Sequence, residues 1–426
     1  MKNSVFILVL SLLQVSFSSG QQDNLLANQE KTQNNQDRFE ELAKRYKSFQ
    51  EKYYAEKPDQ NEDQFKRFLQ QHPMNSMVQE FLALERQSRG SKTGFSCLYH
   101  LVLSAGSVSG VDYPVTKGKV AALRILGDHY RDYPDVDLSF RYLFSGARVP
   151  ETKAFLRKLI KGSKRKYVQA SAMYELANYL AQEANFYSIA NSQLQVIDRK
   201  VKANEPMIKH FESLLSDLKN VSIERNREES RALIKQIKSD YKEELMPPRV
   251  ATRTPGIISV KRGEMDELLK SKRERVVDRL ISVQFELNHG IGQRPPEIDG
   301  QDAKGKPMRL SEFQGKVVVV MFSFKGCGPC EAMYPDNRSL IKELAEEPFE
   351  FLGVQGDEKI ETVRETIDSG DVSWRVWWDG KDKQISNQWN IRGWPTTYVI
   401  DQKGIIRFRD LRGKELATAV RLLLKK

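Results

Sequence analysis

Two cysteines separated by two residues are the side chains of this sequence best suited to chemistry. They are Cys327 and Cys330, in the order Cys-Gly-Pro-Cys, and the chain contains only three cysteines. A continuous apolar run, residues 317–322, precedes them, and a helix is expected to begin at Pro329. Because unpaired backbone N–H groups and the positive end of the helix dipole favour a thiolate, we predict that Cys327 is nucleophilic.

Cys330 follows Cys327 by about one helical turn. At that separation it can attack a mixed disulfide formed at Cys327 and release the partner thiol. The pair therefore predicts a dithiol/disulfide couple that needs no metal and no cofactor. A structural disulfide or a zinc site is the alternative for a cysteine pair, and Cys97 with His100 could complete a Cys3His set.

The elements around the pair read as a small α/β domain, residues 290–426. The run 317–322 is typical of a strand buried on both faces. Further strands are expected at 349–354, 396–400 and 405–409, and helices at 329–344, 358–367, 384–389 and 415–424. Strands that alternate with helices and end in a hairpin indicate the α/β class.

The first two thirds of the chain show helical periodicity. Apolar residues recur at three- and four-residue steps, as in Phe39, Leu42, Tyr46 and Phe49, and Pro or Gly residues separate the successive stripes. No long strand-like run occurs before residue 315. We predict that residues 37–289 form an α-helical region, built as helical hairpins or as a bundle.

The N-terminus predicts export. Lys2 precedes an apolar stretch, residues 5–15, and small residues follow as far as Gly20. This stretch is shorter than the roughly 20 residues of a membrane-spanning helix, so residues 1–20 are interpreted as a cleaved signal peptide and the mature chain as free of membrane spans. Residues 21–36 are polar and rich in Gln and Asn, and are predicted to be a flexible leader.

Composition limits the class of protein. The 426 residues are 39% apolar and 29% charged, which excludes a collagen-like, wholly disordered or polytopic membrane protein. The net charge of +11 belongs to the first part of the chain, since residues 295–426 carry 21 basic and 21 acidic side chains. The basic residues are interleaved with helix-forming sequence and no nucleic-acid motif accompanies them, so nucleic acid is not expected as a partner.

Residues 290–426 resemble the thioredoxin superfamily, and most closely the TlpA/ResA-like bacterial envelope thioredoxins, which are also grouped with redoxin and AhpC/TSA-type domains. The resemblance rests on the cysteine pair, on residues 291–298 and 315–318 before it, and on Gly353, Val354, Asp357 and residues 392–397 after it. It implies a thioredoxin fold in which Pro395 follows a cis peptide bond and lies against the cysteines. It also implies that Trp394 and Pro395, with Gly326, bind the substrate chain.

The resemblance implies an exported thiol–disulfide oxidoreductase of the bacterial periplasm or cell envelope. Its substrates would be disulfide-containing envelope proteins, and a membrane thiol-electron transporter would be its electron donor. The Gly-Pro pair between the cysteines is that of thioredoxin, whose couple is reducing at about −270 mV, so a reductase or isomerase is favoured over an oxidant.

Several positions depart from the family pattern. Gly326 stands where the family commonly has Trp, Met321 where thioredoxins have a buried acid, and Met333 where the envelope branch often has Glu. The proton acceptor for Cys330 is therefore unassigned, and Glu331 is interpreted as a solvated helix residue. Phe324 occupies the position where a peroxiredoxin needs Thr or Ser, which disfavours peroxidase activity.

A binding or scaffold protein is the alternative function. In that case the helical region would be the working surface, and the thioredoxin-like domain would have little turnover. An enzyme should depend on Cys327, whereas a passive module should be indifferent to its loss.

Overall fold

The computed structural model describes residues 19–55, 62–107, 112–143, 146, 148–247 and 273–425. The chain divides into two compact units. One contains the described residues up to Ala172 together with 245–247 and 273–274, and the other contains residues 173–244 and those from Arg275 onward. The predicted signal peptide, residues 1–20, lies outside the described residues apart from its last two, and it stays a prediction.

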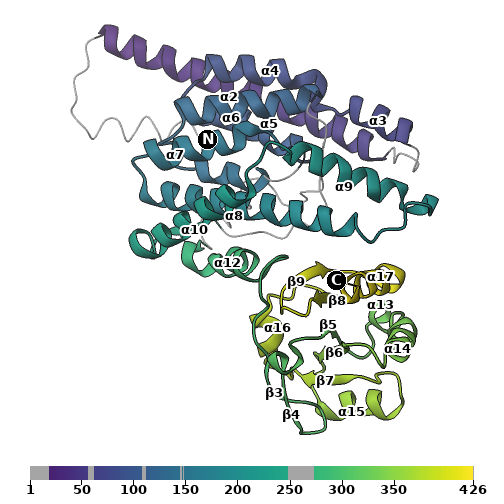
Figure 1. Cartoon of the computed structure of the whole chain (residues 1–426). Helices are drawn as coiled ribbons and strands as arrows, with labels where there is room; N and C mark the ends of the chain where they lie inside the picture. Colours follow the sequence, from purple (N-terminus) through teal and green to yellow (C-terminus); the bar gives the residue numbers. More distant parts are fainter. Residues whose placement is uncertain are drawn as a thin grey trace. The chain divides into compact units, whose positions relative to one another are not determined.

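The first unit is helical (Figure 1). Its buried positions include Phe81, Leu98, Leu101 and Leu123, which lie on the apolar stripes of successive helices. The elements are α2 (Ser19–Ala55), α3 (Glu62–Gln70), α4 (Met74–Gln87), α5 (Lys92–Ser104), η1 (Ala105–Ser107), α6 (Pro114–His129), η2 (Val136–Tyr142), α7 (Pro150–Gly162) and the beginning of α8 (Lys166–Gln193).

The segment 21–36, predicted as a flexible leader, is helical and forms the first half of α2. Asn35 is buried, and the Gln36 side chain accepts a hydrogen bond of 2.9 Å from Thr93. The Gln33 amide also donates to Asp37 one turn further on. Because extending an existing helix costs far less than nucleating one, a polar segment without an apolar face can continue a packed helix.

The second unit combines helices with a mixed sheet. Its helical part contains the remainder of α8, η3 (Lys202–Asn204), α9 (Glu205–Leu218), α10 (Ile223–Asp240), η4 (Val276–Arg279) and α12 (Leu280–His289). Buried polar contacts join these helices: Asn226 donates to Glu183 at 2.8 Å, and Ser230 donates to the Ala177 carbonyl at 2.8 Å. The helical region expected from the sequence is confirmed.

The sheet of the second unit has five strands in the order β7-β6-β5-β8-β9 (Figure 1). Strands β5, β6, β7 and β9 run in one direction, whereas β8, which lies between β5 and β9, runs antiparallel to them. The bounds are β5 (Val317–Ser323), β6 (Phe349–Gln355), β7 (Arg375–Trp378), β8 (Thr396–Ile400) and β9 (Ile406–Arg409), with a separate hairpin of β3 (Asp299–Gln301) and β4 (Pro307–Arg309).

Each face of the sheet has its own apolar core. On one face Val319 and Met321 pack with residues of α14 (Tyr334–Glu343), α15 (Ile360–Asp368) and α17 (Gly413–Leu424). On the other face Val320 and Phe322 pack with residues of α12 and the β3–β4 hairpin and with Trp389, which follows α16 (Gln384–Gln388). The central strand β5 is therefore buried on both faces, as its sequence predicts.

Two local predictions for this sheet need correction. β7 was not expected, because its four residues include Arg375 and the exposed Trp378 and show no apolar run. The helix expected at 329–344 is divided into α13 (Gly328–Glu331) and α14. Pro335, in the first turn of α14, lacks the N–H that a continuous helix would use, which accounts for the break.

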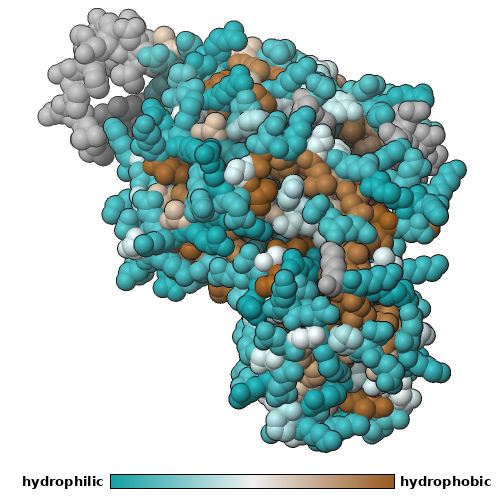
Figure 2. Space-filling view, viewed as in Figure 1, coloured by the Kyte–Doolittle hydropathy of each residue, from teal (hydrophilic) through white to brown (hydrophobic). Residues whose placement is uncertain are grey.

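The surface drawn in Figure 2 is mostly hydrophilic, with apolar side chains gathered in patches. Among the residues for which side chains are described, the large apolar side chains that remain exposed include Phe65, Met207, Ile281 and Trp378. None of the helices within the described ranges combines the length and apolarity needed to cross a lipid bilayer.

Candidate functional site

The two cysteines of the pair are joined by a disulfide, with their Cα atoms 5.2 Å apart. Cys327 follows the turn after β5 and is the N-cap residue of α13, where its carbonyl accepts hydrogen bonds from the amides of Cys330 and Glu331 at 2.8 and 3.0 Å. Cys327 is 6% exposed, whereas Cys330 is fully buried. Of the two cysteines, only Cys327 therefore retains any exposed surface.

The loop before Cys327 is held by two carboxylates. Gly326 has φ = 84°, and its amide donates to Glu331 Oε1 at 2.7 Å. The Lys325 amide donates to the Asp357 carboxylate at 3.1 Å, and burial raises the pKa of this carboxyl while that hydrogen bond opposes the shift. Glu331, predicted to be a solvated helix residue, is an exposed residue of α13, but its carboxylate also holds this loop.

The charge of Lys325 is directed away from the cysteines. Its ammonium is 2.9 Å from Glu365 of α15, and this hydrogen bond raises the pKa of Lys325. Both side chains are exposed, so the pair contributes little to stability.

The peptide bond between Trp394 and Pro395 is cis, as the resemblance implied. Pro395 is buried and directly precedes β8, whose first residue Thr396 pairs with Phe322 near the end of β5. The loop that carries Cys327 starts at that same end of β5. The register therefore brings Pro395 and the cysteine pair to one end of the sheet.

Trp394 lies between the two apolar cores and packs against both. Its ring is 5.7 Å from that of Phe324 in an edge-to-face arrangement, and the Lys383 ammonium lies 5.1 Å from its centroid. Phe324, Trp394 and Lys383 thus form a partly exposed aromatic surface beside the pair.

The positions that carry acids elsewhere in the resembling proteins are apolar here. Met321 is fully buried, and Met333 is 5% exposed in the same core as the two cysteines. The Asn337 amide lies 3.4 Å from the Met321 sulfur. The structure thus offers no carboxylate at either position to receive a proton from Cys330.

Three buried polar residues near the pair were missed by the sequence analysis. They are Ser323 at the end of β5, Gln355 at the end of β6 and Tyr334 at the start of α14. Polar residues inside apolar strand ends are the signal that could have revealed them, but only the register shows that Ser323 and Gln355 lie side by side. We call these residues the polar cluster.

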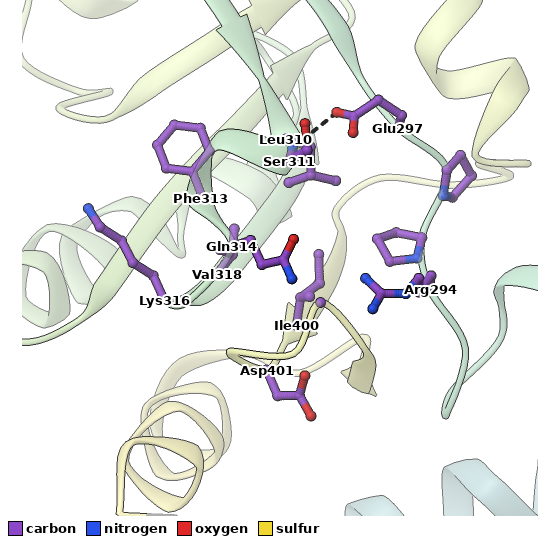
Figure 3. A pocket seen from close by; sticks show the side chains of 13 residues that line it. Arg294, Glu297, Leu310, Ser311, Phe313, Gln314, Lys316, Val318, Ile400 and Asp401 are labelled. Carbon is purple, nitrogen blue, oxygen red and sulfur yellow. Dashed lines mark hydrogen bonds between the residues drawn. The ribbon is translucent and has the colours of Figure 1, made fainter.

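A cavity of about 140 Å³ lies at the other end of the central strand (Figure 3). It is lined by Val318 of β5, Ile400 of β8 and the polar side chains of Arg294 and Gln314, and the Glu297 carboxylate beside it accepts a hydrogen bond from the Ser311 amide. None of the predicted site residues lines this cavity.

No group of three or more metal-binding side chains occurs in the part of the chain that the structure describes. Cys97 lies buried in α5, in the first compact unit, whereas the disulfide pair belongs to the second. The zinc alternative therefore has no support among these residues.

Comparison with known proteins identifies the family. A model described as the AhpC/TSA family matches residues 291–409. The thioredoxin-like protein YneN of Bacillus subtilis (strain 168) is 30% identical over 120 residues, which cover 27% of this chain and 68% of YneN. This chain is a TlpA/ResA-like thioredoxin. The thiol-disulfide oxidoreductase ResA of Bacillus thuringiensis is 27% identical over 136 residues, which cover 32% of this chain and 78% of ResA.

Among solved structures, the thioredoxin domain of a thiol-disulfide oxidoreductase from Bacteroides vulgatus is 29% identical to this TlpA/ResA-like chain. The likeness has a TM-score of 0.30 and covers 32% of this chain and 98% of that domain. The family and the five-stranded sheet together make the C-terminal part of the chain a thioredoxin-fold domain of the thiol–disulfide oxidoreductase type.

Proposed function

We propose that this TlpA/ResA-like protein is exported and exchanges disulfides with protein substrates through Cys327 and Cys330, as a reductase or isomerase. The observation that carries the proposal is the disulfide between Cys327, which retains some exposed surface, and the fully buried Cys330. In the reducing direction the Cys327 thiolate attacks a substrate disulfide and one substrate thiolate leaves. Cys330 then loses its proton, attacks Cys327 and releases the second thiolate, so two electrons pass to the substrate.

Substrate binding in this proposal uses Gly326, Trp394 and Pro395. A proline ring has no N–H to donate and leaves the space in front of the sulfurs open, while the backbone of Trp394 can pair with an extended chain. The aromatic surface of Phe324 and Trp394 supports this assignment, because aromatic side chains bind apolar peptide side chains well.

The compartment and the partners belong to the same proposal. The predicted signal peptide, residues 1–20, supports export to a periplasm or cell envelope, where disulfides persist in substrates. A membrane thiol-electron donor would return the pair to the dithiol form. We also propose residues 290–426 as the redox domain, since the family model begins at residue 291, and residues 37–289 as the helical region, whose last helices pack in one compact unit with the redox domain.

The reduction potential of the pair tests the direction of electron flow. The purified protein is equilibrated with glutathione or dithiothreitol buffers, and the fraction of dithiol is measured by alkylation and mass. A reductase or isomerase should have a potential between about −180 and −270 mV, the range from disulfide isomerase to thioredoxin. A value near −120 mV, that of the oxidant DsbA, would contradict the assignment.

A further inference from the structure

Cys330 must lose a proton before it can resolve a mixed disulfide, and the structure surrounds it with apolar groups. Its side chain has no exposed surface, and the neighbouring Met321 and Met333 are apolar. Burial in such surroundings favours the neutral thiol over the thiolate. If the pair works as proposed above, another group near it must receive the proton.

The polar cluster lies on the face of the sheet that carries the cysteines. Side chains alternate along a strand, so Ser323 projects on the same face as Met321, which packs in one core with Cys327 and Cys330. Gln355 is the register partner of Ser323 on β6. Tyr334 follows Cys330 by four residues and belongs to the same core as both cysteines.

The polar atoms of this cluster are buried and have only one another as partners. Ser323, Tyr334 and Gln355 are 1%, 4% and 1% exposed, and their side-chain polar atoms form no hydrogen bond to any group outside the cluster. Ser323 and Gln355 act on the Tyr334 hydroxyl as side-chain hydrogen-bond partners, which opposes the rise that burial causes in the pKa of Tyr334. Burying polar groups in an apolar core is costly, so their gathering beside a dithiol calls for a function.

Two carboxylates lie near the cluster, and a pair of opposite charges lies beside one of them. Glu331 of α13 and Asp357, two residues beyond Gln355, both raise the pKa of Tyr334. Lys325 donates its amide to Asp357, and Glu365 of α15 holds the Lys325 ammonium. Asp357 is half-buried, and its raised pKa makes it a better proton acceptor than an exposed aspartate.

We propose that the polar cluster carries the proton of Cys330 to Asp357. The Cys330 thiol gives its proton to the Tyr334 hydroxyl, the cluster passes a proton to the Asp357 carboxylate, and Asp357 releases it to solvent. The Cys330 thiolate then attacks Cys327 Sγ, the bond to the substrate sulfur breaks, and the substrate leaves as a thiolate. This proposal rests on the proposed function, and it makes Tyr334 the residue that relays the proton and Asp357 the residue that finally accepts it.

The test separates the two sulfur steps in one reaction. The fully reduced protein is mixed with an excess of a chromogenic aromatic disulfide, and release of the coloured thiolate is followed by stopped flow. The first equivalent reports attack by Cys327, and the second reports resolution by Cys330. Both rate constants are measured from pH 5 to 9 for the wild type and for each variant.

Tyr334→Phe should slow the second release by about tenfold at neutral pH and leave the first release within about twofold. The slowing should shrink at high pH, where the Cys330 thiol ionises without assistance. Asp357→Asn should slow the second release to a similar extent, and the double variant should be no slower than the slower single one, because both residues serve one path.

Tyr398→Phe is the matched control. Tyr398 is 1% exposed, and its hydroxyl is buried without a hydrogen bond, but its side chain packs in the core on the opposite face of the sheet. Tyr398→Phe should leave the rate constants of both releases within about twofold of the wild-type values. Should Tyr334→Phe fail to fold, Ser323→Ala, which removes one oxygen of the cluster, should slow the second release by at least about threefold.

Two results would overturn the inference in distinguishable ways. Suppose that the wild type releases both equivalents and that the second rate constant of Tyr334→Phe stays within twofold of the wild-type value at every pH. The proton path is then wrong and the proposed function stands. If the wild type releases no first equivalent, disulfide exchange at Cys327 is itself wrong, and the proton path is overturned with it.

Discussion

Glu331 closes the loop that carries Cys327, because its carboxylate accepts a hydrogen bond of 2.7 Å from the Gly326 amide. A hydrogen bond to a charged group contributes up to a few kcal/mol, and less when it is exposed. Glu331→Ala should therefore increase hydrogen exchange of the Gly326 amide by about five- to tenfold. Glu331→Gln keeps an acceptor oxygen and should change the exchange by less than about threefold. Equal exchange in both variants would show that the loop does not depend on this bond.

The backbone at Gly326 predicts a second stability difference. Its φ of 84° lies in the left-handed region, and a Cβ built there meets nothing within 4 Å, so only backbone strain opposes a side chain. Gly326→Ala should lower the free energy of unfolding by about 1 to 2 kcal/mol. Gly328→Ala, at an open position without positive φ, should change it by less than about 0.5 kcal/mol. Urea unfolding of both variants measures the difference, and equal stabilities would contradict the account.

The buried ion pair of Asp137 and Arg273 predicts a pH dependence in the first compact unit. The Arg273 guanidinium donates to both Asp137 oxygens at 3.2 and 2.9 Å, and Asp137 is 1% exposed. Burial raises the pKa of Asp137 to about 6, although Arg273 opposes the shift. The folded state therefore binds this proton more tightly than the unfolded state, in which the pKa is near the ordinary aspartate value of 3.8.

Stability from this group is greatest below pH 4 and falls as the pH rises through 6. Over that window the wild type should lose about 3 kcal/mol of unfolding free energy relative to Asp137→Asn, which cannot titrate. The attraction between the ionised Asp137 and Arg273 is already included in the folded-state pKa of Asp137, so it adds no further pH dependence. Chemical unfolding of both proteins at several pH values gives the difference, and a flat difference from pH 4 to 7 would show that folding does not raise the pKa of Asp137.

The sequence predicted the parts of the fold that rest on long apolar patterns. The runs that became β5, β6 and β8 are continuous and buried, so their residues alone indicate strands. β7 was not predicted from the sequence, because its burial depends on residues far away along the chain. Trp377 donates to the Met308 carbonyl at 2.9 Å, and Arg375 pairs with Asp302. Such contacts between residues far apart in sequence leave no local pattern.

Part of the candidate site could likewise be predicted from the sequence, and part could not. Cys327, Cys330 and Pro395 could be predicted, because a short motif and a family resemblance identify them. The polar cluster could not, since Ser323, Tyr334 and Gln355 come together only through the register of β5 with β6 and the break between α13 and α14. Pro335 was the one sequence signal for that break.

The central claim is that Cys327 attacks substrates and Cys330 resolves the intermediate. Cys330→Ser should therefore accumulate mixed disulfides on Cys327 with envelope proteins, visible by mass spectrometry under non-reducing conditions. Cys327→Ser, expressed and treated in the same way, is the matched control and should accumulate far fewer, because its two remaining thiols, Cys97 and Cys330, are both buried. Reducing agent should release the trapped partners from Cys330→Ser. Equal trapping by both variants, or none by Cys330→Ser, would contradict the account.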